Sequence, residues 1–438
     1  MRGLPPRLVQ RIRKRAARVG VIGLGYVGLP LAVEYAKRGF RTVGIDTDGA
    51  RVAQLNRGRS YIPDIRQEEL RPLVRQGLLR GTTRYEVLRE LDAVMICVPT
   101  PLRKTRDPDI SYIVAATEQL ARHLHRHQII SLESTTYPGT TREVILPKLQ
   151  ETGLKVGRDF FLGFSPERID PGNPDYSTST IPKVVSGVTP ACGRAMELLY
   201  RQAIQTVIRV SSTDVAEMVK LLENTFRSVN IGLVNELALM CHRLGVDVWE
   251  VIEAAKSKPF GFMPFYPGPG LGGHCIPVDP LYLSWKAKIH GFEPRFIELS
   301  AQVNGQMPEH VVERVGGLLN RRGKALKGAR ILLLGVAYKR DVSDTRESPA
   351  VEILQSLRAR GCLVQYHDPY VPLLRTDGLT LRSVPLNRRV LQAADCVLIV
   401  TDHRIMDHSQ VVRHARLVFD TRNALRKLRN RSRKIVPL

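Results

Sequence analysis

The N-terminal segment alternates apolar and polar positions in a way that predicts a strand, a turn, a helix and a second strand. In "RVGVIGLGYVGLPLAVEYAKRGFRTVGID" (18–46), a short apolar run leads into Gly23, Gly25 and Gly28. Helical spacing follows, and a second apolar run ends at Asp46. Three glycines between a strand and a helix, with an acid closing the next strand, are typical of a dinucleotide-binding unit. A tight turn without a ligand is the alternative.

The chemistry of this turn favours NAD. The glycines would let the backbone approach a pyrophosphate, and the N-terminus of the helix supplies unpaired N–H groups. Asp46 can accept hydrogen bonds from both ribose hydroxyls, and its charge would repel a 2′-phosphate. Arg51 is close enough in sequence to suit such a phosphate, but contacts with the adenosine are an equal alternative.

Strand and helix patterns continue to alternate after this unit. The apolar runs "DAVMICVPT" and "QIISLES" each lead to a loop rich in Pro, Gly or Thr and then to a helical stretch. This alternation indicates a parallel, doubly wound sheet, whose loops at the strand carboxyl ends line the nucleotide crevice. Thr100 and Thr135 are therefore candidates for nucleotide contacts, with helix capping as the alternative.

A helical pattern of about thirty residues begins at Ser211. Residues 212–214 are N-cap candidates and Gly245 is a C-cap candidate. Lys220 and Asn224 are one turn apart and share a face, which is most often only the solvated side of a helix. The opposite, apolar face is more extensive than a solvated helix needs, with four residues in register: Val229, Leu233, Leu237 and Met240.

A second strand, loop and helix begin at "KGARILLLGVAYKRDVSDTRESPAVEIL" (327–354), without the three glycines. Further strands are indicated at "CLVQYHD", "CVLIVT" and "LVFDT". The loop after the first strand carries Lys339, Arg340 and Arg346, which would suit a phosphate. The whole pattern predicts an α/β protein with two Rossmann-like doubly wound domains, joined by a central all-helical segment with one long helix.

Composition narrows the class of protein. The net charge of +24 invites a nucleic-acid function, but residues 1–18 hold seven basic residues and 413–434 hold nine. These ends lack interleaved aromatic residues or a zinc-finger spacing, so we expect solvated tails and no specific nucleic acid. No apolar run approaches the roughly 18 residues of a membrane span, and no signal peptide is expected. The six cysteines are far apart without a CxxC, which favours a reducing cytoplasm and no metal site.

One cysteine has an unusual setting. In "PGPGLGGHCIPVDPLYLSW" (267–285), Cys275 follows two glycines and a histidine, and Asp279 comes four residues later. Neither a second cysteine nor a run of metal ligands accompanies it. From these residues alone a packed core cysteine is the better interpretation, and a nucleophilic thiol is the alternative.

Seven motifs in order resemble the nucleotide-sugar 6-dehydrogenases, the UDP-glucose/GDP-mannose dehydrogenase family. They are "GLGYVGLPLA", "CVPTP", "STTYPGTT", "SPERIDPG", "KLLENTFRSVNIGLVNE", "GPGLGGHCIPVDP" and "AYKRDVSDTRESP", and the similarity spans about 19–425. The stretch "KPFGFMPFYPGPGLGGHCIPVDPLYLSWKA" looks most like the branch that acts on UDP-N-acetylglucosamine. The resemblance implies an NAD-dependent oxidation at C6 to the uronic acid, a product that commonly feeds surface polysaccharides.

The same chemistry on UDP-N-acetylmannosamine, UDP-glucose or GDP-mannose is the main alternative. A two-electron hydroxyacid dehydrogenase and a nucleic-acid-binding protein are more distant ones. The resemblance also implies a homodimer or higher homo-oligomer. It divides the chain into a basic extension (1–18), an NAD-binding Rossmann domain (19–210), a central helical dimerisation and catalytic domain (211–322), and a C-terminal UDP-sugar-binding domain with a basic tail (323–438).

An alcohol taken to a carboxylate loses four electrons, so two NAD molecules are needed and the aldehyde must be held between them. The resemblance implies that Cys275 holds it as a thiohemiacetal, which the second oxidation turns into a thioester. The other catalytic residues that it implies are Lys220 and Asn224 at the reacting oxygen, Asp279 as an orienting acid, Glu167 as base for thioester hydrolysis, and Thr135 near the water.

The resemblance also implies the binding residues. Those for the cofactor are Gly23, Gly25, Val27, Gly28, Asp46, Arg51, Thr100, Thr135 and Arg346. Those for the substrate are Glu167, Arg168, Lys220, Asn224, Phe265, Tyr266, Gly272 and Lys339. Plain UDP-glucose is put in doubt by departures from its dehydrogenases at three positions: Arg168, Pro171 and His274.

Overall fold

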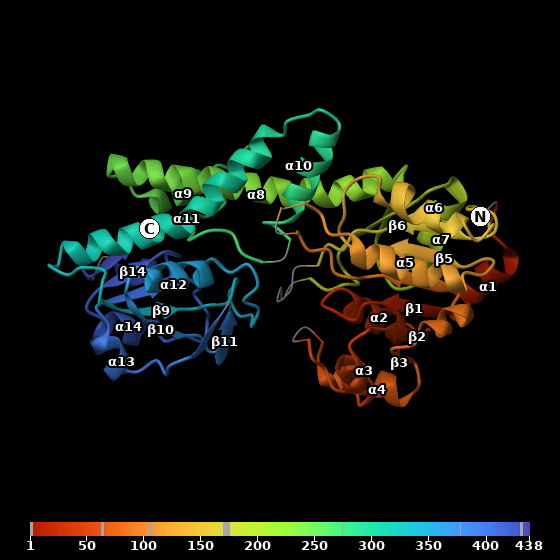
Figure 1. Ribbon diagram of the computed structural model, residues 1–438, viewed down its shortest axis with the longest axis horizontal. Coiled ribbons are helices and arrows are strands. Elements are labelled where there is room, and N and C mark those ends of the chain that lie inside the picture. Colours follow the sequence, from red (N-terminus) through yellow and green to blue (C-terminus); the bar gives the residue numbers. More distant parts are fainter. Residues whose placement is uncertain are drawn as a thin grey trace. The chain divides into compact units, whose positions relative to one another are not determined.

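The structure is a computed structural model that describes residues 3–62, 65–103, 105, 107–169, 176–273, 275–376, 378–429 and 432–438 (Figure 1). The chain forms two compact units. The first contains Met1–Glu223 and Trp285–Gly291, and the second contains Asn224–Ser284 and Phe292–Leu438. Two helices, α8 (Thr213–Leu244) and α10 (Asp279–Ile289), contribute residues to both.

The first unit is a Rossmann-like domain. Its elements are α1 (Pro6–Arg13), β1 (Arg18–Ile22), α2 (Gly28–Lys37), β2 (Arg41–Ile45), α3 (Gly49–Asn56), α4 (Gln67–Arg75), β3 (Leu79–Thr82), η1 (Tyr85–Glu90), β4 (Ala93–Ile96), α5 (Ser111–His123), β5 (Ile129–Leu132), η2 (Thr141–Ile145), α6 (Leu146–Gln150), β6 (Phe161–Phe164), β7 (Lys183–Gly187), α7 (Pro190–Tyr200) and β8 (Val207–Arg209).

The strands of this unit form one sheet in the order β3-β2-β1-β4-β5-β6-β7-β8. Its pairings are parallel except for β6 with β7, which are antiparallel. Helices α1, α2, α4 and α7 pack on one face, and α5, η2 and α6 pack on the other. The central strands β4, β5 and β6 are buried throughout, as expected for a sheet covered on both faces.

Helix α8 begins and ends as the sequence predicts. The Ser212 hydroxyl accepts a hydrogen bond from the Val215 N–H, and Gly245 follows the helix with φ +70°. Its apolar face is uneven in burial, because Leu233 is 53% exposed and Met240 is 49% exposed. Among the described residues, nothing covers these two large apolar side chains fully, and such exposed apolar surface is typical of an interaction site.

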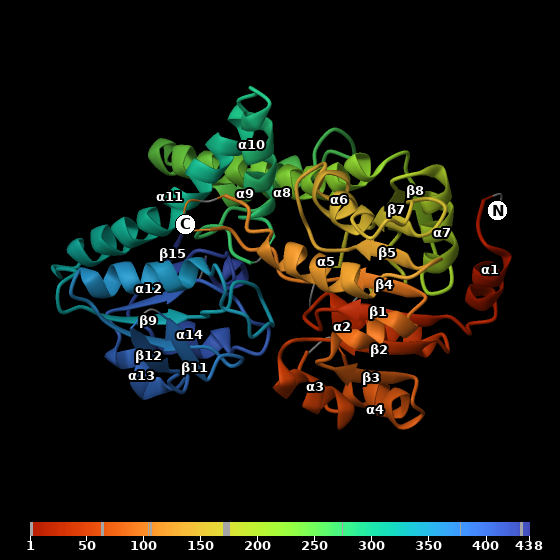
Figure 2. The same cartoon turned by 45° about the vertical axis from the view of Figure 1, so that its right-hand side comes forward.

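The second unit contains a smaller Rossmann-like domain. Its elements are α9 (Val248–Ala255), α11 (Arg295–Asn320), β9 (Arg330–Leu334), α12 (Pro349–Ala359), β10 (Leu363–His367), β11 (Leu373–Thr376), β12 (Leu379–Arg382), α13 (Arg388–Ala393), β13 (Cys396–Ile399), α14 (His408–His414), β14 (Val418–Asp420), α15 (Arg426–Arg429) and β15 (Ile435–Pro437). The parallel sheet has the order β10-β9-β13-β14-β15, and β11 and β12 form a separate hairpin. Helices α11 and α12 cover one face, and α13 and α14 cover the other (Figure 2). The predicted fold class is confirmed.

The expectation that both basic ends are solvated tails is wrong. Near the N-terminus, Leu8 and Ile12 of α1 are buried in the core of the first unit, and Arg11 forms an ion pair with Asp92 at 2.7 Å. At the C-terminus, β15 pairs with β14 in the second sheet. Apolar residues between the charges drive this packing, which net charge alone does not reveal.

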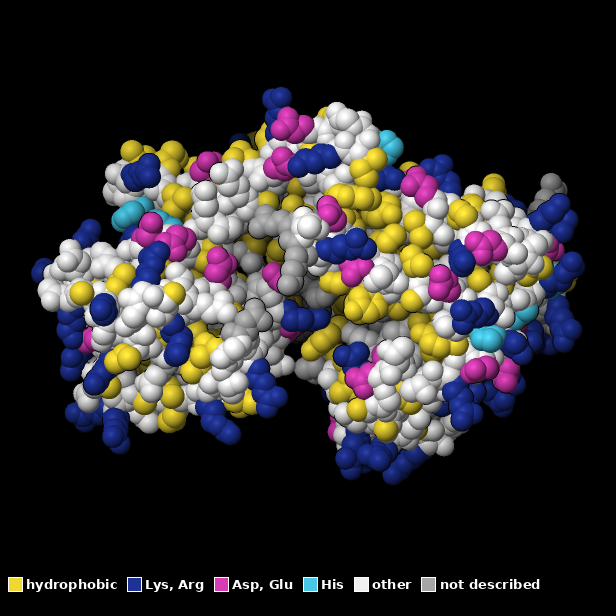
Figure 3. All heavy atoms as spheres, viewed as in Figure 1, with side chains coloured by type: hydrophobic (Ala, Val, Ile, Leu, Met, Phe, Trp, Pro, Cys, Tyr) yellow, Lys and Arg dark blue, Asp and Glu magenta, His cyan; other side chains and the backbone are white. Residues whose placement is uncertain are grey.

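One face of the molecule shows how its basic side chains are distributed. On the face shown in Figure 3, Lys and Arg side chains are spread around the edges of both units and do not form one continuous patch. Across the part of the chain that the structure describes, no helix is long and apolar enough to cross a membrane. The same described residues contain no group of three or more His, Cys, Asp or Glu that could hold a metal ion.

Candidate active site

The turn after β1 requires glycine at two positions. Gly23 has φ +90°, and a Cβ there would lie 2.5 Å from the Cys97 carbonyl oxygen. A Cβ on Gly28, the first residue of α2, would lie 1.8 Å from the Gly23 oxygen. At Gly25, by contrast, a Cβ would meet no atom within 4 Å, so the backbone faces open space. Val27 precedes α2 and is half-buried. The turn can therefore accept a phosphate group against its backbone.

Asp46 follows β2 and is only 7% exposed. Its carboxylate accepts hydrogen bonds from the N–H groups of Leu24 and Asp48, both at 2.8 Å. A carboxylate has about four acceptor positions, so two remain for ribose hydroxyls. The Arg51 guanidinium lies 3.7 Å from Asp46 and 3.3 Å from Asp48. The turn and its acid thus fit NAD.

Thr100 and Thr135 lie in loops at the carboxyl ends of β4 and β5, where a doubly wound sheet binds nucleotides. Thr100 is 9% exposed, and Thr135 is half-buried. The capping alternative is wrong for both, because the N-cap residues of the next helices are Ile110 and Thr140.

The loop after β5 is fixed by a carboxylate of α8. Glu217 accepts hydrogen bonds from the N–H groups of Gly139 (2.6 Å) and Thr141 (2.9 Å), and from the Thr141 hydroxyl (2.7 Å). Burial raises the pKa of Glu217 to about 7, although these donors oppose the rise. The loop that carries Thr135 is therefore tied to the helix that carries Lys220, which is 8% exposed.

Glu167 lies beyond β6 and is held on both oxygens. Oε1 accepts hydrogen bonds from the N–H groups of Arg168 and Ile169, both at 2.8 Å. Oε2 accepts one from the Lys183 ammonium at 2.8 Å. Burial alone would raise the pKa of Glu167, but the nearby Lys183 charge and these hydrogen bonds bring it below its ordinary value. Glu167 is thus an oriented carboxylate that stays ionised at neutral pH.

The Arg168 side chain is engaged within the first unit. Its guanidinium lies 2.6 Å from the Glu223 carboxylate on α8 and donates to the Pro182 carbonyl oxygen at 2.8 Å. This pairing fixes Arg168 beside Glu167. The neighbouring position, Pro171, lies outside the described residues.

In the second unit, Cys275, Asn224 and Asp279 form one group. The Cys275 carbonyl oxygen accepts the Asp279 N–H at 2.7 Å, which closes a turn immediately before α10. The Asn224 amide donates to the Asp279 carboxylate, which is 3% exposed. Cys275 is half-buried, whereas the other five cysteines, all within the described residues, are buried. His274 lies outside the described residues.

The glycine-rich loop before Cys275 packs against the first loop of the second Rossmann-like domain. A Cβ on Gly272 would lie 2.8 Å from the Tyr338 Cβ and 2.9 Å from Pro349. A Cβ on Gly273 would lie 2.7 Å from the Tyr338 ring. Only glycine permits this approach, which brings the loop of Cys275 next to the loop that carries Lys339.

The aromatic candidates are placed by α8 and α9. Phe265 packs against the small core between these helices, with its ring 5.7 Å from that of Phe226. Tyr266 stacks on Trp249 and donates to Glu253 at 2.7 Å. Both side chains are therefore held in place before a ligand binds.

The basic residues of the second domain differ in their partners. Arg346 forms a two-pronged ion pair with Asp344, at 2.6 Å for the closer contact, and Arg340 pairs with Asp402. Lys339 is half-buried. The sequence analysis missed Arg422, whose guanidinium would lie 2.5 Å from a Cβ on Gly268 and thus borders the glycine-rich loop. Its position after a strand end was the available signal.

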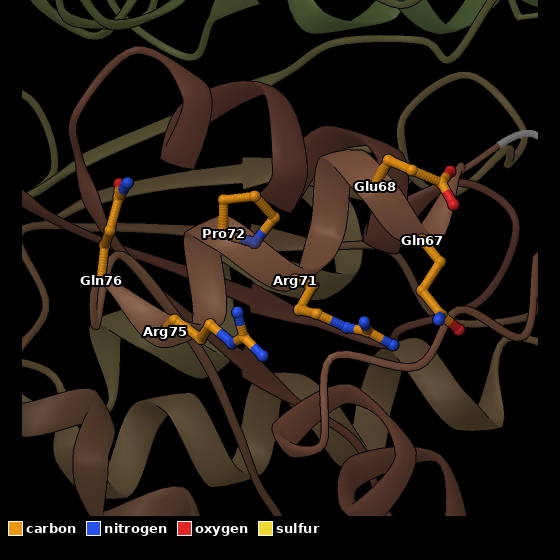
Figure 4. Close-up of a pocket in the computed structure, with 6 residues that line it drawn as sticks. All are labelled: Gln67, Glu68, Arg71, Pro72, Arg75 and Gln76. Carbon is orange, nitrogen blue, oxygen red and sulfur yellow. The ribbon is translucent and has the colours of Figure 1, made fainter.

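A hollow of about 300 Å³ elsewhere on the first unit is lined by residues of α4 and its end: Gln67, Glu68, Arg71, Pro72, Arg75 and Gln76 (Figure 4). It contains none of the candidate residues, and its lining comes from one helix with no convergent catalytic groups. It is therefore separate from the candidate site.

Sequence profiles of the UDP-glucose/GDP-mannose dehydrogenase family match three segments of the chain. The NAD binding domain of the family matches residues 17–204, the central domain matches 214–306, and the UDP binding domain matches 332–427. Together these segments account for most of the chain.

Individual relatives are similar over most of their length. UDP-N-acetyl-D-glucosamine 6-dehydrogenase of Pseudomonas aeruginosa is 40% identical over 81% of this chain and 83% of that protein. The structure of UDP-D-ManNAc dehydrogenase from Pyrococcus horikoshii has a TM-score of 0.85 and 34% identity, covering 93% of this chain and 96% of that one. A UDP-glucose dehydrogenase structure from Pyrobaculum islandicum has a TM-score of 0.81 and 28% identity, covering 93% and 95%. The three are named for three different sugars.

Proposed function

Because the chain belongs to the UDP-glucose/GDP-mannose dehydrogenase family and is an NAD-dependent nucleotide-sugar dehydrogenase, we propose that it oxidises UDP-N-acetyl-D-glucosamine at C6 to UDP-N-acetyl-D-glucosaminuronic acid. The observation that carries the proposal is the state of Cys275, which alone among the six described cysteines is not buried. Its loop ends in a turn closed by Asp279. A half-buried thiol in such a loop can bond to a substrate carbon.

The proposed reaction passes through two covalent states of Cys275. NAD, held by the turn from Gly23 to Gly28 and by Asp46, would supply the hydride acceptor for each of the two oxidations, one NAD molecule for each. The thiolate adds to the C6 aldehyde to form a thiohemiacetal, and the second oxidation leaves a thioester on the sulfur. Water then releases the acid and restores the thiol.

Lys220 and Asn224 would stabilise the oxygen at C6, which carries negative charge in both oxidations. Both are buried and lie one turn apart on α8, so their positions relative to each other are fixed by the helix. The hydrogen bond between Asn224 and Asp279 orients the amide. Loss of one such donor costs roughly 3–4 kcal/mol of transition-state stabilisation.

Glu167 would take a proton from the water that attacks the thioester, with Thr135 near that water. The lowered pKa keeps Glu167 ionised at neutral pH, as a base requires. The substrate would contact Arg168, Phe265, Tyr266, Gly272 and Lys339. The cofactor would contact the turn from Gly23 to Gly28 together with Asp46, Arg51, Thr100 and Arg346.

We assign NAD binding to residues 19–210, catalysis and dimerisation to 211–322, and UDP-sugar binding to 323–438. The reduced cysteines and the cofactor fit a cytoplasmic enzyme. UDP-N-acetyl-D-mannosamine is the second candidate substrate, because the similar Pyrococcus horikoshii structure is named for that sugar.

We also propose a homodimer built on α8 and α11. Leu233 and Met240 on α8 and Phe296 on α11 are large apolar side chains that are 53%, 49% and 79% exposed. A second copy would remove this surface from water. Light scattering should give twice the mass of one chain, and Leu233→Lys with Met240→Lys should shift it toward the monomer. A strict monomer at micromolar concentration would overturn the proposal.

The test of the reaction is its stoichiometry. With limiting UDP-N-acetyl-D-glucosamine, each mole of sugar should yield two moles of NADH without free aldehyde. Cys275→Ala should lower production of the acid by at least about 1000-fold, whereas Cys241→Ala, at a buried cysteine, should keep it. One NADH per sugar would establish a two-electron dehydrogenase. A panel of nucleotide sugars, compared by kcat/KM, identifies the substrate.

A further inference from the structure

A buried cluster of three charges lies at one edge of the first sheet. The Lys183 ammonium is 2.7 Å from Glu133 and 2.8 Å from Glu167. The side chains of Lys183 and Glu133 are 3% and 0% exposed. One cation therefore serves two carboxylates in a setting where unpaired charge is costly.

The strand pairing explains how the cluster forms. Glu133 follows β5, Glu167 follows β6, and Lys183 is the first residue of β7. In the antiparallel pairing, Phe164 of β6 lies opposite Ser186 of β7. Extending that register by three residues places Glu167 opposite Lys183. The ammonium is thus held at the carboxyl edge of the sheet, where nucleotides bind.

The second carboxylate has its own donors. The hydroxyls of Tyr200 on α7 and Ser131 on β5 both donate to Glu133 Oε1, the latter at 3.1 Å. The charge of Glu133 also acts on Tyr35 on α2 and on Cys97 after β4. Burial raises the pKa of each of these tyrosines and of Cys97, so these groups stay neutral. Within the described part of the first unit, the charged groups that act on Glu167 are thus Lys183 and Glu133, and the guanidinium of the adjacent Arg168 pairs with Glu223.

Charge balance shows what Glu133 adds. If Lys183 had Glu167 as its only partner, a proton on Glu167 would leave a buried ammonium unpaired, at a cost of several kcal/mol. Burial raises the pKa of Glu133, although the Lys183 charge and hydrogen bonds oppose the rise. While Glu133 is ionised, Lys183 keeps one partner when Glu167 takes up a proton. The carboxylate of Glu167 can therefore gain and lose a proton without isolating the lysine.

We propose that Lys183 and Glu133 are positioning residues for thioester hydrolysis: Lys183 holds the Glu167 carboxylate in place and ionised, and Glu133 keeps Lys183 paired while Glu167 carries a proton. The inference rests on the proposed role of Glu167 as base. As the water oxygen bonds to the thioester carbon, its proton passes to Glu167. The carbon–sulfur bond then breaks with its electron pair on sulfur. The proton on Glu167 returns by way of solvent to the Cys275 thiolate, and the acid product loses its own proton to solvent.

The test measures the pH dependence of hydrolysis itself. The enzyme is loaded with substrate and NAD, and the disappearance of added mass from the Cys275 peptide is followed across pH. Lys183→Met removes the cation, so the acid limb of the profile should move to higher pH. The rate on that limb should fall about tenfold for each unit of displacement. Glu133→Gln removes an anion and should move the limb to lower pH.

Matched variants separate positioning from a structural role. Lys183→Arg retains the charge and should restore the limb toward that of the unmodified enzyme. Lys148→Met makes the same change at a surface lysine that is 3.0 Å from Glu151, and should leave the profile unmoved. If Lys183→Met does not fold, two other profiles still test the inference. Glu133→Gln should move the acid limb to lower pH, and the double variant with Lys183→Met should have its acid limb at higher pH than Glu133→Gln alone.

The inference would be overturned if folded Lys183→Met and Glu133→Gln both have the pH profile of the unmodified enzyme. It would also be overturned if the two profiles move in the same direction. The number of NADH molecules formed per sugar distinguishes failure of this inference from failure of the proposed function. Two NADH per sugar with unmoved profiles overturns the positioning roles alone. One NADH per sugar overturns the thioester chemistry on which they rest.

Discussion

The two Rossmann-like domains share a structural feature: a glycine turn after the first strand and an aspartate after the second strand. In the first, Gly23 follows β1 with φ +90° and Asp46 follows β2. In the second, Gly335 follows β9 with φ +82° and Asp368 follows β10. Each acid accepts backbone N–H groups from the turn after the preceding strand. In both domains the hydrogen bonds from the turn to the aspartate therefore connect the ends of two neighbouring strands.

The two aspartates differ in how many of their hydrogen-bond acceptor positions are already used within the protein. Asp46 accepts two backbone N–H groups and has capacity left. Asp368 accepts four, from Val336, Ala337, Tyr370 and Val371, and also contacts His403 at 3.0 Å. A carboxylate with this many partners has no position for a ribose. The same fold therefore binds a dinucleotide only where its loops leave acceptors and space unfilled.

The largest expected effect comes from removing the fully occupied acid. Asp368→Ala leaves four N–H groups, three of them in buried hydrogen bonds, and His403 without their acceptor, so it should destabilise the second unit by about 3–5 kcal/mol. Asp46→Ala should cost less, since fewer groups depend on it. Urea unfolding of both variants measures the difference. An equal decrease in the free energy of unfolding for the two variants would contradict the difference inferred between Asp46 and Asp368.

A second effect concerns a buried carboxyl of the first unit. The pKa of Glu217 is raised from 4.5 to about 7, chiefly by burial. The folded state thus binds more protons than the unfolded state between these values. The contribution of Glu217 to the free energy of unfolding is therefore fully present below pH 4.5. It decreases by about 3 kcal/mol as the pH rises through 7. Glu217→Gln should flatten that fall, measured by Tm from pH 4.5 to 8.

Asp420 is the matched position in the second unit. Like Glu217 it accepts three hydrogen bonds, here from the backbone N–H groups of Arg422, Ala424 and Leu425, and burial raises its pKa. Asp420→Asn should likewise reduce the fall of Tm with rising pH. If neither variant changes the slope of Tm with pH, the buried carboxyls do not control it.

The open acid of the first domain should control cofactor use. Asp46→Asn keeps an acceptor but removes the charge, so kcat/KM for NAD should fall about 30-fold, equivalent to about 2 kcal/mol. The preference for NAD over NADP should narrow at the same time, because the repulsion of a 2′-phosphate is lost. Steady-state kinetics with both cofactors measure this. A higher kcat/KM with NADP in the unmodified enzyme would contradict the assignment of Asp46.

The smallest effect concerns the basic loop that replaces the glycines in the second domain. Lys339→Ala should raise KM for the nucleotide sugar about tenfold through loss of one charged hydrogen bond, with KM for NAD unchanged. Lys324→Ala is the control, because Lys324 pairs with Asp395 on the surface of the same unit. An equal rise in KM for NAD would mean that the two domains do not divide the ligands as proposed.

The sequence by itself determined the features that depend on neighbours along the chain. The strand, the turn and Asp46 are local, because the spacing of apolar residues and the geometry of glycine act over a few positions. The limits of α8 were predictable for the same reason, since Ser212 and Gly245 act within one turn. The family resemblance, which the comparisons confirm, also rests on short motifs in order.

The tertiary structure alone decided which distant groups meet. Nothing local predicts that β7 runs antiparallel to β6, yet this pairing sets Lys183 opposite Glu167. A parallel β7 would have placed the same lysine at the other edge of the sheet. The packing of Gly272 against Tyr338 and of α1 against the first core depends likewise on long-range order. The energy of a buried charge is set by its neighbours in space, and strand order determines those neighbours.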